Sequence, residues 1–429
     1  MNARAPTLNK DADELPYGTW LTAIVMVMRS SAIEQGVARY VSESLNNSGA
    51  IMLALSLCIG MGWIILRRIP QRLPRAISAA WPMFLFCGFA LTSSLWSPVP
   101  EATAQETIHV VMTVVAAMFL AALASWRQLI KGTALGLVAV SFLSLLTVPF
   151  GGIDHGVHAG ALQGFWEEKN GAGQVYAYAG IASVCLAALE RRPVWLWLLP
   201  PMAILTLLAE STTSLLCLVV GISILAAIVV AGNSNPGRAI VVLWAAIMGL
   251  GLGYLNWTNF EDQIFELLGK DRTLTGRAEV WDAVLRRIHE RPWLGYGYHA
   301  FWNEHSPYAL RVRHEVHFDV FNAHSSLLEA LLSTGIVGTS LLIWFAVRSV
   351  LGAGGGILVP HDNRRFGLPL ILAVMVISFS ESILIGAAGI GWFAYLAFGI
   401  KAAMGPAIAV PEDRMPARRF VPYTDAVYL

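Results

Sequence analysis

Charged side chains are scarce in this 429-residue chain, and their scarcity argues against a soluble protein. Only 13% of the residues are charged, about half the share of an average soluble domain. There is no basic patch with interleaved aromatic residues, so nucleic acid is not expected as a partner. The four cysteines lie inside apolar runs without paired spacing, and therefore indicate neither disulfides nor a metal site. The first 16 residues are mixed in charge and are expected to be a tail, not a signal peptide.

Long apolar runs fill most of the remaining sequence. Hydrophobic residues make up 56% of the chain, and many runs have the roughly 20 residues that a bilayer-spanning helix needs. Because a bilayer cannot satisfy open backbone groups, these runs must be helices. We predict an all-α polytopic membrane protein of about 12 transmembrane helices, with one large periplasmic loop containing short helices. The predicted spans are 17–30, 49–66, 77–95, 105–124, 132–150, 171–189, 193–210, 213–231, 239–255, 325–347, 366–382 and 384–400.

The distribution of arginine and lysine predicts the orientation of these spans. Basic clusters follow spans two, four, six, eight, ten and twelve, so they share one side with the N-terminus. We therefore expect a multi-pass protein with both termini in the cytoplasm. The expected parts are a tail at 1–16, helices at 17–255, the large periplasmic loop at 256–324, helices at 325–403 and a second tail at 404–429.

One segment, residues 257–324, breaks the apolar pattern. It carries 8 basic and 10 acidic side chains, which is 18 of the 57 in the chain (29 basic plus 28 acidic). Since this segment is expected to face water outside the cytoplasm, it is where we expect the chemistry to occur.

Residues 275–291 of the loop predict a short amphipathic helix that Thr275 caps and Pro292 ends. Arg277 falls on the apolar face of this helix and is predicted to point toward the protein body. An inward arginine costs free energy unless a negative group meets it. It is either a structural ion pair or snorkelling side chain, or a fork that binds a phosphate or diphosphate. The apolar stripe consists of Trp281, Val284, Leu285 and Ile288, and the remaining charges, Glu279, Asp282, Arg286 and Glu290, lie off it.

Two further features of the loop are candidates for a site. Gly295 and Gly297 indicate a tight turn that a ligand or a backbone approaches closely. His324 lies where the loop re-enters the membrane, and Ser326 with Glu329 has the spacing of a capping box. The positive end of the helix dipole would keep the imidazole neutral and able to accept a proton. A lone histidine at this place is also consistent with a merely polar interface residue.

Three ordered strings in this region resemble the O-antigen ligase and Wzy-type polysaccharide polymerase superfamily. They are LLGKDRTLTGRAEVW, ERPWLGYGYHAFW and NAHSSLLEALLSTGIVG, and their detail is most similar to the exopolysaccharide polymerase branch. LWSPVPE at 95–101, EKNG at 168–171 and SES at 380–382 also resemble family landmarks, so the resemblance covers roughly residues 50–400.

This resemblance implies a glycosyltransferase of the bacterial inner membrane. It implies that a glycan linked to undecaprenyl diphosphate is the donor, that an acceptor hydroxyl attacks its anomeric carbon, and that the linkage inverts without a metal or cofactor. By position in the motifs, His324 corresponds to the general base and Arg277 to the diphosphate-binding arginine. Trp281, Gly295, Gly297, Tyr298 and Glu329 are expected to shape the substrate site, with Glu381 as a polar neighbour.

The chain departs from the family in one motif. A Ser-x-Ser-Arg/Lys-Thr string is usual at the outer end of an earlier span, but the matching stretch here, AESTTSLL at 209–216, has Thr212 at the cation's place. Lys169, before the sixth span, is a candidate replacement for that cation.

Three functions are compatible with these features. A polysaccharide polymerase that joins lipid-linked repeat units into exopolysaccharide or capsule is favoured by the TLTGR and RPWLGYGY strings. An O-antigen ligase that transfers lipid-linked glycan to lipid A core shares the same chemistry. A polysaccharide transporter or flippase is disfavoured, because the spans carry few charges and show no paired halves. Expected partners are the lipid-linked oligosaccharide and the bilayer, and chain-length regulators and export proteins are further candidates.

Overall fold

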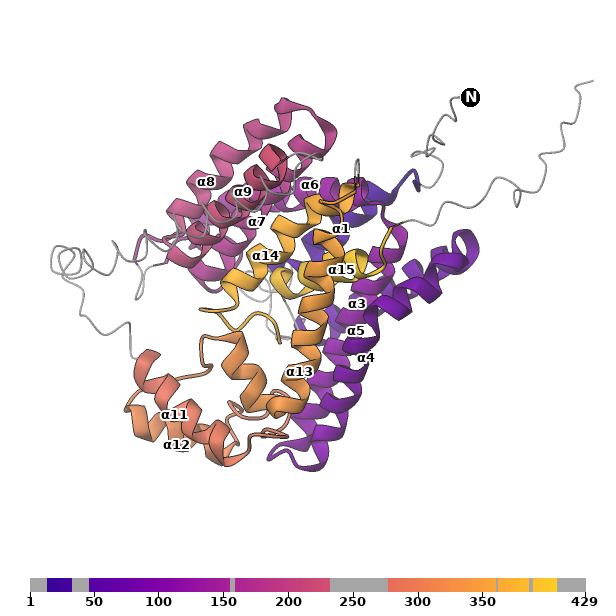
Figure 1. Ribbon diagram of the computed structural model, residues 1–429. Coiled ribbons are helices and arrows are strands. Elements are labelled where there is room, and N and C mark those ends of the chain that lie inside the picture. Colours follow the sequence, from indigo (N-terminus) through magenta and orange to yellow (C-terminus); the bar gives the residue numbers. More distant parts are fainter. Residues whose placement is uncertain are drawn as a thin grey trace, which may run out of the picture.

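The computed structural model describes residues 14–32, 46–154, 159–231, 277–359, 362–385 and 389–406. These residues form helices and turns, with one isolated antiparallel bridge between Ile153 and Leu162. Figure 1 shows the helices packed into one bundle, with α11 and α12 at one end of it. The helices are α1 (Gly18–Arg29), α3 (Asn46–Arg68), α4 (Leu73–Thr92), α5 (Pro100–Leu123), α6 (Trp126–Ser144), α7 (Lys169–Glu190), α8 (Leu199–Leu208), α9 (Thr212–Ala231), α11 (Arg277–Glu290), α12 (Pro307–Val316), α13 (Ser326–Gly354), α14 (Leu368–Ile377) and α15 (Ile390–Ala403). Short 3₁₀ helices, η2 (Pro70–Arg72), η3 (Ser93–Leu95), η4 (Leu145–Phe150), η5 (Pro193–Leu198) and η6 (Asn363–Gly367), adjoin them.

The predicted polytopic α-helical membrane protein is confirmed. Six helical stretches of the described chain are long and apolar enough to cross a bilayer: Pro70–Leu95, Pro100–Leu123, Trp126–Phe150, Lys169–Glu190, Thr212–Val230 and Ser326–Gly354. Three shorter apolar helices, Gly18–Arg29, Pro193–Leu208 and Ile390–Ala403, pack among them. The count of twelve stays a prediction, because the span at 239–255 lies outside the described residues.

The two last predicted spans, 366–382 and 384–400, are longer than the helices found there. α14 ends at Ile377 and α15 begins only at Ile390. Between them, the backbone N–H groups of Ile383 and Leu384 donate to the Ser326 side chain instead of continuing a helix. The chain at 378–385 is therefore irregular, and it is held against the start of α13.

The basic loops gather at the end of the bundle opposite α11 and α12. Arg127 and Lys131 at the start of α6 pair with Glu190 at the end of α7. The 3₁₀ helix η6, which carries Arg364 and Arg365, packs against α6, α7 and α13. α11 instead packs on the early part of α13, whose 29 residues separate the two ends. This arrangement agrees with basic loops on one side and the charged loop on the other, while the cellular side of each remains a prediction.

α13 is interrupted at Gly335, and the interruption is filled by the turn at 292–297. Gly335 has φ 60° and ψ −165°, which removes the helical bonds from the N–H groups of 336 and 337 to the carbonyls of 332 and 333. Those N–H groups donate to the carbonyls of Pro292 and Trp293, and the freed carbonyls of Leu332 and Ser333 accept from the N–H groups of Tyr296 and Gly297. All four freed backbone groups therefore find hydrogen-bond partners within the protein, as is required of a helix that crosses a bilayer.

The glycines of this junction are needed for close approach of two backbones. A Cβ atom at Gly335 would lie 2.3 Å from the carbonyl carbon of Trp293, and one at Gly295 would lie 2.5 Å from the Leu332 carbonyl oxygen. A Cβ atom at Gly297 would lie 2.8 Å from Ser97, in the loop before α5. Of the two glycines predicted to form a close-approach turn, Gly295 therefore lies against the backbone of α13 and Gly297 lies against Ser97.

α11 confirms the predicted amphipathic helix but corrects its apolar stripe. The buried face consists of Val280, Ala283, Val284 and Ile288, which pack with α12 and the turn in a small second core. Trp281 and Leu285 are 37% and 41% exposed, because α13 and α12 contact the helix about one residue to the side of the predicted stripe. The charges predicted to lie off the stripe, Glu279, Asp282, Arg286 and Glu290, are exposed.

The break in α13 gives a first prediction. Gly335→Ala should lower the thermal unfolding midpoint of the protein in detergent, because the strained backbone alone costs about 1–3 kcal/mol for a residue with a side chain. Gly88→Ala in α4 is the matched control, since nothing lies within 4 Å of its Cβ position and alanine is the better helix former. Equal midpoints for the two variants would contradict the role given to Gly335.

Candidate active site

His324 lies at the N-terminal entrance of α13, two residues before the helix begins. Its backbone is left-handed, with φ 47°, a conformation uncommon for residues other than glycine. The His324 N–H donates to the Asn322 side-chain oxygen at 2.8 Å. The predicted place of the histidine at the helix start is confirmed, and its strained backbone indicates that the surrounding structure fixes it there.

The predicted capping box at the start of α13 is wrong. The N-cap residue is Ser325, whose side chain makes no capping bond. The Ser326 hydroxyl donates to the Glu381 carbonyl at 2.7 Å and accepts from the irregular segment, and Glu329 accepts from Ala323 instead of Ser326. Both side chains tie the helix start to other parts of the chain.

The Glu381 carboxylate faces the ring of His324. Its Oε2 atom lies 3.8 Å from His324 Nδ1, and the Glu381 side chain is 10% exposed. Nδ1 is buried and has no hydrogen-bond partner among the described residues, whereas the His324 side chain as a whole is 35% exposed. The exposure therefore belongs to the rest of the ring, on the side away from Glu381.

α7 reaches the same carboxylate from the other side. Asn170, in the first turn of α7, donates to Glu381 Oε1 at 3.0 Å. The neighbouring Lys169 donates from Nζ to the Glu210 carbonyl at 3.2 Å, and Thr213 of α9 accepts from Ser380 at 3.1 Å. The structure thus brings the EKNG, AESTTSLL and SES stretches together beside His324.

Two predicted site residues hold the backbone immediately before His324. Trp281 Nε1 of α11 donates to the Ala323 carbonyl at 2.8 Å, and the buried Glu329 carboxylate accepts from the Ala323 N–H. Glu329 Oε1 also accepts from Trp302 Nε1 at 2.8 Å. Both residues therefore contact the polypeptide that presents His324, and their contact with substrate stays a prediction.

Gly295 and Gly297 lie in the turn at 292–297, which meets α13 at Gly335, and Tyr298 follows that turn directly. The buried Tyr298 donates its hydroxyl to the Ile385 carbonyl at 2.6 Å, and its ring packs edge-on against Phe86 of α4. These contacts join the turn to the bundle and to the same irregular segment that carries Glu381. Arg277 is the first residue of α11, and its side chain lies outside the described residues.

α11 is joined to α12 by a cluster of charges. Arg287 pairs with Glu290 and, at 3.2 Å, with Glu315 of α12, and Tyr296 donates to Glu290 at 2.9 Å. Burial acts to raise the pKa of Glu290, but the bonds from Arg287 and Tyr296 outweigh it and leave that pKa below its ordinary value. The carboxylate is therefore ionised at neutral pH and supports the packing of the two outer helices.

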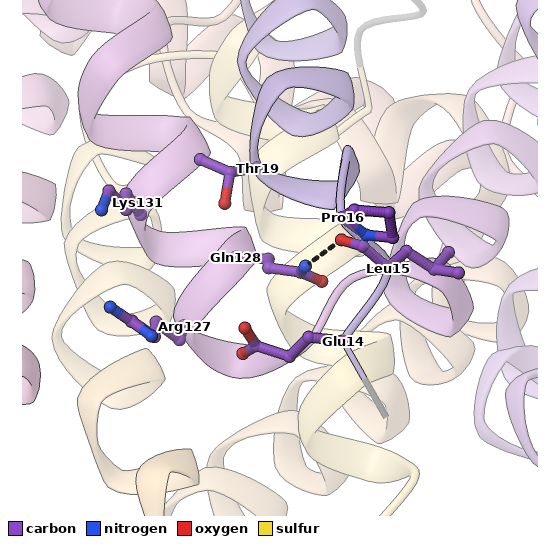
Figure 2. Close-up of a pocket in the computed structure, with 7 residues that line it drawn as sticks. All are labelled: Glu14, Leu15, Pro16, Thr19, Arg127, Gln128 and Lys131. Carbon is purple, nitrogen blue, oxygen red and sulfur yellow. Dashed lines mark hydrogen bonds between the residues drawn. The ribbon is translucent and has the colours of Figure 1, made fainter. Parts of the chain in front are cut away.

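A separate pocket lies at the opposite end of the bundle. Figure 2 shows its lining residues, which come from the chain before α1, from α1 and from α6. The volume of the pocket is about 210 Å³. Gln128 bonds across it to the Leu15 carbonyl, and Arg127 and Lys131 also pair with Glu190. Because none of its residues lies near His324, this pocket is not assigned to the candidate site.

Comparison with known proteins finds a described family that the charged loop resembles. Residues 197–343 match the O-antigen ligase family. This confirms the resemblance to the O-antigen ligase and polysaccharide polymerase superfamily. The matched stretch includes Arg277 and His324, while Lys169, Asn170 and Glu381 lie outside it.

Two curated proteins are similar to the chain. "Exopolysaccharide production protein ExoQ" of Rhizobium meliloti is 26% identical over 68% of this chain and 70% of that protein. An "O-antigen ligase" of Pseudomonas aeruginosa is 30% identical over 28% of this chain and 25% of that protein. The exopolysaccharide branch is thus the broader match, as the motif strings predicted.

Sequence reasoning missed Asn170 and gave Glu381 only a minor place. The two residues are 211 positions apart, and no local periodicity predicts their hydrogen bond. The only available signal was the presence of both in family-like strings, EKNG and SES.

The support of Ala323 gives a second prediction. Glu329→Gln should retain folding and activity, because the amide oxygen can still accept from Ala323 and Trp302. Glu329→Leu leaves two buried donors without a partner, at about 1–3 kcal/mol each. We expect a lower unfolding midpoint and less product for the leucine variant only. Equal loss in both variants would show instead that the charge of Glu329 matters.

Proposed function

We propose that this protein is a polysaccharide polymerase of the bacterial inner membrane. It would join oligosaccharide repeat units carried on undecaprenyl diphosphate into exopolysaccharide or capsule at the periplasmic face. The observation that carries the proposal is His324, which lies inside the matched ligase region and is held at the entrance of α13 with Nδ1 toward Glu381. The broader similarity to the exopolysaccharide production protein favours polymerisation.

The proposed reaction is an inverting glycosyl transfer without a metal. With a proton on Nδ1 facing Glu381, the other ring nitrogen of His324 is free to accept a proton. It would take the proton of an acceptor hydroxyl as that oxygen bonds to the anomeric carbon of the donor. The bond between that carbon and the diphosphate breaks at the same time, and undecaprenyl diphosphate leaves with the electron pair.

Arg277 is proposed to bind the donor diphosphate. A guanidinium fork matches two phosphate oxygens at once and stabilises the charge that develops on the leaving group. Its place at the first residue of α11 is joined to His324 through Trp281, which bonds to the Ala323 carbonyl. Trp281, Gly295, Gly297, Tyr298 and Glu329 would shape the site by holding this entrance in place.

An O-antigen ligase is the second candidate. It is favoured by the matched family and by the Pseudomonas aeruginosa relative, which is named as an O-antigen ligase. The chemistry would be the same, with lipid A core as the acceptor instead of a second lipid-linked unit. A polysaccharide transporter has no comparable support.

The assignment of His324 as the general base gives a third prediction. It is tested by measuring the length of the lipid-linked glycan in cells. Deletion and His324→Ala cells should both accumulate single repeat units and make no polymer. Full-length polymer trapped on undecaprenyl diphosphate would instead identify a ligase. Normal polymer from His324→Ala at wild-type protein level would refute both assignments.

The proposed role of Arg277 is tested by two substitutions, one that removes its charge and one that keeps the charge but changes the shape of the side chain. Arg277→Ala should lower the rate on the order of 10²- to 10³-fold, and Arg277→Lys should recover only part of it, because lysine cannot form a fork. Arg286→Ala is the matched control, since Arg286 is an exposed arginine of the same helix. A lysine variant with full activity would contradict bidentate binding.

Lys169 is proposed as the second cationic residue of the site. It would replace the arginine or lysine of the family motif, whose position is occupied by Thr212 in this chain. Lys169→Met should lower activity, whereas Lys401→Met should not, although Lys401 also donates to a backbone carbonyl, that of Ala121 at the opposite end. Wild-type polymer from Lys169→Met would remove Lys169 from the site.

A further inference from the structure

Glu381 lies in a part of the chain that cannot by itself fix the orientation of the Glu381 side chain. It lies between α14 and α15, in the irregular segment 378–385, where no continuous helix fixes its side chain. Its backbone is attached to α13 by the Ser326 hydroxyl, which donates to the Glu381 carbonyl. The carboxylate itself therefore needs a second attachment if Oε2 is to stay directed at His324.

Asn170 supplies that attachment from a rigid helix. A carboxylate can only accept hydrogen bonds, so the NH₂ group of Asn170 must face Glu381 Oε1, at 3.0 Å. α7 is well buried and packs against α6, α8 and α9. Asn170 is half-buried, and Ala172 and Gly173 in the same turn of the helix are buried. The amide is thus fixed by the bundle and not by the loop that carries the glutamate.

The two oxygens of Glu381 face different groups. Oε1 receives the Asn170 amide, and this leaves Oε2 as the oxygen nearest His324 Nδ1, at 3.8 Å. That separation is slightly longer than a hydrogen bond, as is common for catalytic groups without bound substrate. Rotation of the carboxylate away from Asn170 would remove Oε2 from this place and allow the imidazole to adopt either tautomer.

We infer that Asn170 is a positioning residue for His324, acting through Glu381. The inference rests on the proposed function, in which His324 is the general base. Asn170 holds the carboxylate, the carboxylate holds the proton on Nδ1, and the opposite ring nitrogen is thereby kept ready to accept the proton of the acceptor hydroxyl. The role concerns the reaction step and not the binding of either glycan.

The test is a double-mutant cycle on purified full-length protein, with the lipid-linked glycan extracted from deletion cells as substrate. Asn170→Ala should lower kcat on the order of 10-fold, the scale of one hydrogen bond to a charged group, and leave KM unchanged. In the Glu381→Ala background the same substitution should cause no further loss. An equal loss in both backgrounds, or a change in KM alone, would overturn the inference.

Thr213→Val is the matched control. It removes another side-chain bond between the spans and the same irregular segment, the one with Ser380, without touching Glu381. We expect nearly full kcat from this variant, and a loss equal to that of Asn170→Ala would indicate a general structural effect.

His324→Ala separates the inference about Asn170 from the proposed function. If His324→Ala is inactive while Asn170→Ala is normal, only the role of Asn170 fails. If His324→Ala is active, the proposed function fails.

Discussion

The exchange of backbone hydrogen bonds at Gly335 is the constraint on which the candidate site depends. A continuous α13 would satisfy its own backbone and offer nothing to the charged loop. Because the helix is broken, its open carbonyls and N–H groups bind the turn at 292–297 by four hydrogen bonds. These bonds are directional and admit only one register, so they fix the outer helices against the bundle more specifically than the small apolar core could. The position of α11 relative to His324 follows from them.

The entrance of α13 is then determined from several directions at once. Ala323 is held by its carbonyl and its N–H, through Trp281 and Glu329, and the next residue takes the left-handed conformation. Such a conformation costs free energy and persists only when the surroundings require it. The helix start is also bonded through Ser326 to the segment that carries Glu381. The histidine ring is consequently placed by the polypeptide on both sides of it.

Local patterns predicted the parts of this fold that local physics decides. Apolar runs and the 3.6-residue period were sufficient for the membrane class, for α11 and for the place of His324 before a helix. They failed where distant contacts compete with local ones: Ser326 and Glu329 have capping-box spacing, yet both bond elsewhere. The apolar stripe of α11 was displaced by one residue for the same reason, because α12 and α13 decide which side is covered. Gly295 and Gly297 were correctly expected to admit close approach, but only the structure shows that α13 approaches Gly295 and that Ser97 approaches Gly297.

The site divides its tasks between rigid helices and irregular chain. His324 and Glu381 both lie outside regular helix, where the backbone can present a side chain at an angle that a continuous helix does not allow. Asn170 and Trp281 lie on α7 and α11, and each meets the irregular chain with one hydrogen bond. Fixing a side chain on irregular backbone costs conformational entropy. The hydrogen bonds from Asn170 and Trp281 offset part of that cost. The chemistry of the site therefore depends on residues that would be judged structural from their contacts alone, and the contact of Asn170 with Glu381 joins segments 211 positions apart.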